Sequence, residues 1–278
     1  MEKSGLWGHM KLYQVDSFTS VAFRGNPAGV WIGETFPADS MMQSLAAEVN
    51  ASETAFVACG GGRFQIRYFT PTREVPLCGH ATLASAHILR ELGKVEDGVA
   101  FMLHAAETEL PVRVTDGWVH MAFPVYPLTR IEIPGYLEPL IGSPVTEAFK
   151  SDNNWIVARL PDERCLLAAR PDFPAIQAGD AAVLIAATTE SADADYDFSV
   201  RVFCNPAYGI EEDPVTGAAQ CILAPYWHGE VKKELFVSRQ LSRRGGEMKA
   251  KILGEAVEIM GQAVTVFVAD VRYGPYCR

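Results

Sequence analysis

A long internal repeat limits what this 278-residue chain can fold into more than any other feature of its sequence. The segment FQIRYF at residues 64–69 returns as FSVRVF at residues 198–203, an offset of 134 residues. Allowing one inserted residue carries the match into the following loop, where Cys78 aligns with Asp213. Strands, loops and helices follow in the same order in both halves, so duplication explains the match better than chance similarity does. A period this long predicts two similar domains and not a solenoid.

Most of the predicted elements are strands, with one helix rich in small residues in each half. Alternating apolar and β-branched residues predict the strands, and the two helices are expected near Ala81 and Ala218. We therefore predict a mixed α/β (α+β) fold with two pseudo-symmetric domains, residues 11–127 and 128–278. Proline residues between the halves mark the break. The C-terminal strand is an alternative member of the N-terminal domain.

Charge and hydropathy exclude two classes of partner. The formal net charge is −10 and no basic run is interleaved with aromatic residues, which argues against nucleic acid. No apolar run approaches the roughly 18–20 residues that a membrane-spanning helix needs. The first ten residues contain one lysine and no apolar core, so they do not resemble a signal peptide. We set them aside from the fold and expect the native start near Met10.

Six cysteines at scattered spacings predict reduced thiols and not a disulfide framework. The sequence contains no CxxC pair and no two histidines at the spacing of a zinc-protease helix. We therefore expect a cytoplasmic protein without a metal site.

In each half, a strand runs into a loop that opens a helix of small residues. The first N–H groups of a helix lack intrahelical partners and carry a partial positive charge, which favours a carboxylate there. Two facing domains would bring the segment Cys78–His80 opposite the segment Asp213–Gly217. We expect both helices to direct their N-termini into one shared cleft, because small-molecule sites favour domain interfaces. A small acid would be held there from both sides.

Glu53 is the candidate general base. Removing a proton from a carbon beside a conjugated acid requires a base within hydrogen-bond reach and donors for the charge that develops. Glu53 stands at the head of the apolar segment ETAFV, whereas Glu74, Glu211 and Glu212 lie in polar loops. A proton returned to another carbon would make the protein an isomerase, and a proton returned to the opposite face would make it a racemase.

Four segments of the chain resemble one known family: FRGNPAGV, ASETAFV, FTPTREVPLCGHATLA and YGIEEDPVTGAA. They are similar to the phenazine-biosynthesis isomerase family, often called PhzF-like, within the diaminopimelate epimerase fold superfamily. The resemblance runs from about Leu12 to Val268, nearly the whole chain. It implies two similar α/β domains, each a β-barrel around a central helix, with the active site in the cleft.

The resemblance also implies a catalytic set. The glutamate of the family's SE(S/T)xF motif corresponds to Glu53, which becomes the proposed base. The histidine of the GH motif corresponds to His80, and the aspartate of the ED motif corresponds to Asp213.

A second implied set binds the substrate. Backbone amides at Gly79, Gly217 and Ala218 would hold the substrate carboxylate, and Cys78 is placed beside them as a substrate-binding residue. The family commonly has a serine where this chain has Ala218, so a hydroxyl that would contact the substrate is absent. The phenazine enzyme itself has no thiol at the position of Cys78, so the resemblance does not identify the substrate of this chain.

Each candidate residue also has a purely structural interpretation. Glu53 could pair with Arg67, and Asp213 could simply cap a helix. Cys78 could be a small buried residue, and residues spaced like Cys78 and His80 do not readily form a nucleophile–base pair. Racemases of the superfamily use two thiols on opposite faces of the substrate. With Asp213 near the second thiol position, two-cysteine racemisation is disfavoured.

We predict a cofactor-independent isomerase that moves a proton on a small, cyclic or unsaturated carboxylic acid. Two alternatives remain: an amino-acid epimerase or racemase of the same superfamily, and a non-catalytic protein that binds small molecules. The expected partner is the small carboxylate, with no nucleic acid, no membrane and no cofactor. A homodimer is one expected assembly.

Overall fold

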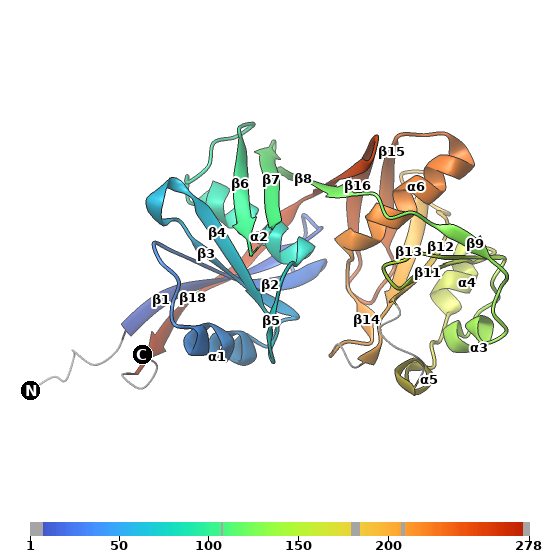
Figure 1. Cartoon of the computed structure of the whole chain (residues 1–278), viewed down its shortest axis with the longest axis horizontal. Coiled ribbons are helices and arrows are strands. Elements are labelled where there is room, and N and C mark those ends of the chain that lie inside the picture. The colour runs from blue at the N-terminus through green and yellow to red at the C-terminus, as the bar shows by residue number, and fades with distance from the viewer. Residues whose placement is uncertain (1–7, 107, 179–183, 207–208, 275–278) are drawn as a thin grey trace, which may run out of the picture. The chain divides into compact units, whose positions relative to one another are not determined.

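Strands predominate in the fold, which is a mixed α/β arrangement (Figure 1). The computed structural model describes residues 8–106, 108–178, 184–206 and 209–274. The fold class predicted from the sequence is confirmed. Among the described residues, no helix combines the length and the apolarity that crossing a bilayer requires. The cysteines within these ranges form no disulfide.

Two compact units divide the chain, and the first is discontinuous in sequence. Unit 1 comprises Met1–Met121 and Gly261–Arg278, whereas unit 2 comprises Ala122–Met260. The C-terminal segment belongs to unit 1 because its strand pairs with the first strand of the chain. The boundary predicted from the proline residues, after residue 127, lies a few residues beyond the division between Met121 and Ala122. Pro124, one of these prolines, is the last residue of a strand and not part of a linker.

Unit 1 is built around one long helix, α2. Its elements are β1 (Gly8–Ser17), β2 (Asn26–Gly33), α1 (Asp39–Val49), β3 (Glu53–Ala58), the 3-10 turn η1 (Gly60–Gly62), β4 (Phe64–Phe69), β5 (Glu74–Val75), α2 (Gly79–Glu91), β6 (Ala100–Ala105), β7 (Thr108–Thr115), β8 (Trp118–Pro124), which continues past the unit boundary, and β18 (Ala263–Tyr273).

Small residues let the strands approach α2 closely. The helix contacts β1, β2, β3, β7 and β18, so strands lie on several sides of it. Ala81, Ala84 and Ala86 are fully buried, and so are the larger side chains of Leu83 and Leu89. Each fully buried leucine of this kind contributes about 1.5–3 kcal/mol relative to an exposed one. The helix is therefore held by packing on most of its circumference.

Unit 2 has the same plan around α6. Its elements are β9 (Thr129–Ile131), α3 (Leu137–Ile141), β10 (Glu147–Lys150), β11 (Trp155–Arg159), α4 (Glu163–Ala168), α5 (Phe173–Ala178), β12 (Leu184–Glu190), β13 (Phe198–Phe203), β14 (Glu212–Asp213), the 3-10 turn η3 (Gly217–Ala219), α6 (Gln220–Val231), β15 (Leu235–Gln240), β16 (Gly246–Leu253) and β17 (Ala256–Gly261). Trp227 of α6 is buried and stacks on Phe198 of β13, with ring centroids 5.4 Å apart.

The two units repeat one series of strand pairings. In unit 1, β2 runs parallel to β3, β3 antiparallel to β4, and β4 parallel to β6. In unit 2, β11 runs parallel to β12, β12 antiparallel to β13, and β13 parallel to β15. The short strands β5 and β14 pair antiparallel with the ends of β4 and β13. This shared series supports the duplication inferred from the sequence.

The register of the short strands corrects the alignment at Cys78. Val75 of β5 and Asp213 of β14 each oppose the penultimate residue of the longer strand. Val75 is therefore the counterpart of Asp213, and three residues further along Thr216 is the counterpart of Cys78. The predicted pairing of Cys78 with Asp213 is wrong because four residues join β4 to β5 whereas eight join β13 to β14. A single inserted residue cannot absorb that difference.

The first strand begins earlier than expected. β1 starts at Gly8, which opposes Tyr273 of β18. Setting aside all of the first ten residues was therefore wrong for Gly8, His9 and Met10, which continue the antiparallel pairing with β18. Residues 1–7 lie outside the described part of the chain.

Candidate active site

Glu53 is positioned by the short connection between α1 and β3. α1 ends at Val49, and Asn50 follows in the left-handed conformation (φ 52°), which turns the chain out of the helix. Two residues later, Glu53 begins β3 and lies opposite Ala28 of the parallel strand β2. The Glu53 side chain keeps 22% of its surface exposed, so its carboxylate is accessible from outside the core.

Cys78 and His80 lie at the start of α2. The backbone of Cys78 is extended (φ −144°, ψ 114°), and its thiol does not cap the helix. Because Cys78 precedes the helix, its side chain is free of the helical geometry that keeps positions i and i+2 on different faces. The thiol therefore reaches the ring of His80, whose side chain is nearly buried.

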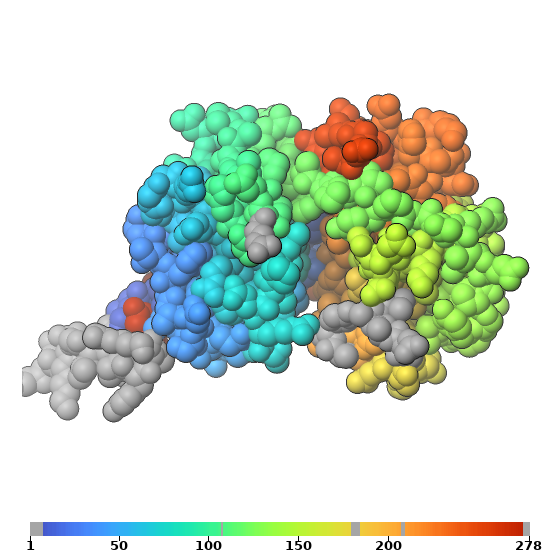
Figure 2. Space-filling view, in the orientation of Figure 1, coloured from blue at the N-terminus to red at the C-terminus, as the bar shows by residue number. Residues whose placement is uncertain are grey.

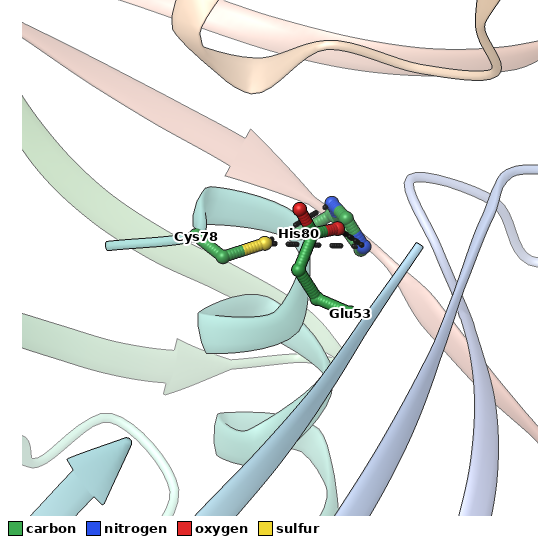
Figure 3. Close-up of side chains that lie close together, drawn as sticks. All are labelled: Glu53, Cys78 and His80. Carbon is green, nitrogen blue, oxygen red and sulfur yellow. Dashed lines mark hydrogen bonds and ion pairs between the residues drawn. The ribbon is translucent and has the colours of Figure 1, made fainter. Parts of the chain in front are cut away.

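Glu53, Cys78 and His80 form one cluster, in which the thiol and the carboxylate both point toward the imidazole (Figure 3). His80 Nε2 lies 3.4 Å from Glu53 Oε2, and Cys78 Sγ lies 3.4 Å from His80 Nδ1 and 3.9 Å from Nε2. The imidazole thus contacts the carboxylate through Nε2, whereas the thiol lies within contact distance of both ring nitrogens and is nearer to Nδ1. The expectation that Cys78 and His80 would not pair is wrong, because only His80 belongs to the helix.

Two serines hold His80 in place. Ser17 Oγ, at the end of β1, donates to the backbone oxygen of His80 at 2.8 Å. Ser52 Oγ lies 3.2 Å from His80 Nε2. Neither serine was predicted. Ser52 could have been identified from the sequence, because it immediately precedes Glu53 in the segment ASETAFV. Nothing in the sequence distinguishes Ser17.

A buried chain of hydroxyl groups fixes the backbone at Cys78. Thr82 Oγ1 donates to the carbonyl oxygen of Cys78 at 2.7 Å, which uses the only proton of that hydroxyl. The Tyr68 hydroxyl, 2.6 Å from Thr82 Oγ1, is therefore the donor of the second bond. Burial raises the pKa of Tyr68, so the phenol stays protonated and keeps this donor role. The chain links β4 to the first turn of α2.

The N-terminus of α2 has space beside its first residue. The N–H groups of Gly79, His80 and Ala81 have no partner within the helix and lie at the positive end of its dipole. Apart from its chain neighbours and the backbone of its own helix, a methyl group added at Gly79 would meet no atom of the described residues within 4 Å. The space beside the Cα atom is therefore open, and the binding role of Gly79 stays a prediction.

Among the predicted residues of unit 2, Asp213 belongs to a hydrogen-bonded group with Thr216 and Gln240, neither of which was predicted. Asp213 Oδ2 accepts a 2.6 Å hydrogen bond from Thr216 Oγ1. Gln240 Nε2 donates to the Asp213 carbonyl at 2.6 Å, and Gln240 Oε1 accepts from the Thr216 N–H at 2.9 Å. In η3, Gly217 is buried and Ala218 is exposed. The catalytic role of Asp213 and the binding roles of Gly217 and Ala218 stay predictions.

A hollow of about 560 Å³ in unit 1, whose residues before the boundary are coloured blue to green in Figure 2, is a poorer candidate for an acid site. Its lining includes Arg67 and Glu74 but none of the cluster residues. Arg67 already donates to both carboxylate oxygens of Glu74 and to Asp39, all at 2.7 Å. This guanidinium is therefore neutralised within the protein. Because Glu53 contacts His80 instead, the alternative pairing of Glu53 with Arg67 is wrong.

Sequence comparisons place the chain among proteins with matching length. A family model described as "Phenazine biosynthesis-like protein" matches residues 15–269. An uncharacterized isomerase of Halalkalibacterium halodurans is 37% identical over 94% of this chain and 97% of its own. A second uncharacterized isomerase, from Pseudomonas aeruginosa, is 39% identical over 95% of this chain and 98% of its own.

Structural comparisons agree with the sequence. The crystal structure of a PhzF family protein from Enterococcus faecalis has a TM-score of 0.89 at 32% identity, covering 95% of this chain and 99% of that one. A hydroxyproline epimerase of Agrobacterium vitis shares the fold, with a TM-score of 0.58 at 14% identity over 96% of this chain and 94% of that one. The resemblance inferred from the four sequence segments is confirmed, and the chain belongs to the phenazine biosynthesis-like (PhzF) protein family.

Proposed function

We propose that this protein is a cofactor-independent isomerase that moves a proton on a small, cyclic or unsaturated carboxylic acid. The observation that carries the proposal is the 3.4 Å contact between Glu53 Oε2 and His80 Nε2 at the start of α2. It places an accessible carboxylate beside a nearly buried imidazole, next to free space at a helix N-terminus. The bacterial relatives named isomerases support the enzyme class.

The acid group of the substrate binds at the N-terminus of α2. The N–H of Gly79 and the helix dipole attract a carboxylate, and the open space beside Gly79 accommodates it. This contact fixes the distance between the acid group and Glu53. The carbon that loses its proton then lies within reach of the Glu53 carboxylate, as general base catalysis requires.

Glu53 carries the proton between two carbons. Its carboxylate takes a proton from the carbon beside the conjugated system, the C–H bond breaks, and the electron pair moves into that system. The resulting carboxylic acid of Glu53 returns the proton to a different carbon, and the double bond shifts. With a proton on Nε2, His80 donates to the carboxylate and holds its orientation, while Nδ1 accepts from the Cys78 thiol.

A second candidate function is epimerisation, which the 3.4 Å contact between Cys78 Sγ and His80 Nδ1 favours. In that reaction Cys78 would act as a second proton carrier, with His80 as its base. The product would keep its double bonds and change only its configuration. The counterpart of Cys78 in unit 2 is Thr216, so the thiol pair used by two-cysteine racemases is incomplete in this chain.

Three expectations from the sequence accompany this proposal without bearing on the Glu53 step. Asp213, Gly217 and Ala218 stay predicted contributors to catalysis and binding. A cytoplasmic location and a homodimeric assembly also stay predictions. Which acid of this class is the substrate depends on chemical groups of the acid other than its carboxylate and its labile proton.

Deuterium uptake from heavy water tests the role of Glu53. We would incubate the protein with a panel of small cyclic and unsaturated carboxylic acids and follow C–H exchange by NMR. Glu53→Gln keeps the size of the side chain but cannot accept a proton, so uptake should fall by about 10² to 10⁴-fold. Glu48→Gln is the matched control, because Glu48 is exposed on α1 and outside the cluster.

Ligand binding must be measured in parallel. Saturation-transfer NMR should show that Glu53→Gln still binds the acid that wild type exchanges. Equal uptake by wild type and Glu53→Gln at equal occupancy would remove Glu53 from the mechanism. Exchange without a double-bond shift, combined with inverted configuration, would instead support the epimerase function.

A further inference from the structure

We propose that Glu53, Cys78 and His80 form a binding site for a thiophilic divalent cation, Zn²⁺ above all. Each residue offers one ligand atom, and these atoms lie within 4.8 Å of one another. The expectation that the chain has no metal site rested on the lack of local ligand spacing. The structure brings the three residues together from two elements, β3 and the start of α2, which no local spacing could reveal.

The distances suit a tetrahedral ion. Zn²⁺ binds cysteine sulfur at about 2.3 Å, histidine nitrogen at about 2.0–2.1 Å and carboxylate oxygen at about 2.0–2.2 Å, so neighbouring ligand atoms are separated by roughly 3.3–3.6 Å. Here His80 Nε2 lies 3.4 Å from Glu53 Oε2 and 3.9 Å from Cys78 Sγ. Small rotations of the Cys78 and Glu53 side chains would complete three corners of a tetrahedron, with the fourth left for water.

The donor set selects the class of metal. A thiolate, an imidazole and a carboxylate together suit Zn²⁺ and its spectroscopic substitute Co²⁺, whereas Mg²⁺ and Ca²⁺ prefer oxygen ligands alone. Binding replaces the thiol proton of Cys78, which is released to solvent. Ser17 supports His80, because its hydroxyl holds the backbone oxygen of that residue. The Ser52 hydroxyl, 3.2 Å from Nε2, would have to give up this contact when the ion binds.

A bound cation would block the reaction proposed above. It would occupy the Glu53 oxygen that accepts the substrate proton and the His80 nitrogen that orients this oxygen. Zinc would therefore act as a reversible inhibitor, and a chelator would restore activity. This consequence rests on the proposed isomerase function, whereas binding itself depends only on the three ligand atoms.

Titration of the full-length protein with Co²⁺ tests the site without any substrate. Wild-type protein, treated with a chelator and kept reduced with a phosphine, should develop a sulfur-to-cobalt charge-transfer band that Zn²⁺ abolishes by competition. Cys78→Ser should lose the band. Cys165→Ser is the control, because this partly exposed thiol lies on α4, outside the cluster. Circular dichroism would confirm that each variant is folded.

Zinc affinity supplies the second measurement. Glu53→Gln should weaken Zn²⁺ binding by about 10-fold or more, since the loss of even an outer-shell partner costs roughly 10 to 100-fold. A folded wild type without the band, or a band that persists in Cys78→Ser, would overturn the proposal. If the band follows Cys78 while deuterium exchange is unchanged in Glu53→Gln, the metal site stands and the proposed catalytic role of Glu53 falls.

Discussion

The first turn of α2 and the turn η3 before α6 share one backbone design and differ in chemistry. Both follow a two-residue strand, both have a glycine as their first residue, and both are preceded by a residue with extended backbone. In unit 1 that residue is Cys78, and its thiol contacts His80. In unit 2 it is Thr216, and its hydroxyl binds Asp213. The duplicated scaffold has therefore kept the helix start and changed the side chains around it.

The two units also share an arginine–glutamate pair close to each turn. Arg67 donates twice to Glu74 in unit 1, and Arg201 donates twice to Glu212 in unit 2, at 2.8 and 2.9 Å. These pairs tie the short strand to the long one beside it. The shared part of the two units is thus the part that fixes the backbone, and the divergent part is the part that contacts a ligand in the proposed function.

Substitutions at equivalent positions of the two turns should have unequal effects on catalysis. His80→Asn should lower deuterium exchange by about 10²-fold, because it removes the ring that orients Glu53. Ala218→Ser, at the counterpart position, should leave exchange within about 10-fold, because it removes no group that carries or orients a proton. Comparable losses in both variants would mean that the two turns contribute equally and that the chemistry is not confined to unit 1.

The residues just before the two turns should differ in their effect on stability. Thr216→Ala removes a hydroxyl that donates to the Asp213 carboxylate at 2.6 Å and lies 3.3 Å from Gln240 Nε2, so it should cost about 1–2 kcal/mol of unfolding free energy. Cys78→Ala removes a weaker sulfur contact and should cost at most about 1 kcal/mol. It should also keep most of the exchange activity if Glu53 is the sole base.

Guanidinium unfolding of both variants, followed by tryptophan fluorescence, measures this difference. A larger loss in Cys78→Ala than in Thr216→Ala would show that the thiol supports the fold of unit 1. A severe loss of exchange in folded Cys78→Ala would favour the epimerase function instead.

The last difference concerns pH and the middle of the two central helices. His87 of α2 corresponds to Pro225 of α6, so only α2 carries a titratable group there. Burial lowers the pKa of His87 from its usual value of about 6.5, although the nearby Glu91 opposes the shift. The unfolded chain therefore binds this proton more readily, and the stability contributed by neutral His87 is lost as the pH falls through about 6.5.

Comparison of unfolding free energies at pH 7.5 and pH 5 isolates this term. His87→Gln keeps a polar group near Thr265, which lies 3.2 Å from His87 Nε2, but it does not titrate. Wild type should lose more stability than His87→Gln on acidification, by about 1.4 kcal/mol for each unit by which the pKa is lowered. Equal losses in the two proteins would assign the acid sensitivity to other groups.

Much of this comparison could be predicted from sequence periodicity. The two copies of the strand motif, FQIRYF and FSVRVF, revealed the duplication because β-strands conserve alternation and length. The family segments placed Glu53, Cys78 and His80 in one functional set, although they lie on two elements. Loop length was the part that could not be predicted, since loops accept insertions at little cost. The longer β13–β14 loop is the reason why Asp213 was aligned with Cys78.

The contact between Cys78 and His80 could not be predicted without the backbone conformation at Cys78. Whether a residue just before a helix is helical or extended decides where its side chain points, and the sequence LCGHA does not fix that boundary to within one residue. The hydrogen bond from Ser17 to His80 was even harder to predict, because it joins residues 63 positions apart in the sequence. Such contacts depend on how the sheet wraps around α2 and have no local pattern.

The return of β18 to unit 1 gives the two units different histories during synthesis. Unit 2, residues 122–260, is continuous, so all of it has been translated before Ala263 is added. The cluster residues of unit 1 are translated early, whereas its last strand, β18, is translated at the end. Until then, one edge of β1 has no neighbouring strand. An unpaired strand edge is prone to pair with other chains. A ribosome that stalls after unit 2 therefore exposes a chain whose later half is complete while its first half still has an open sheet.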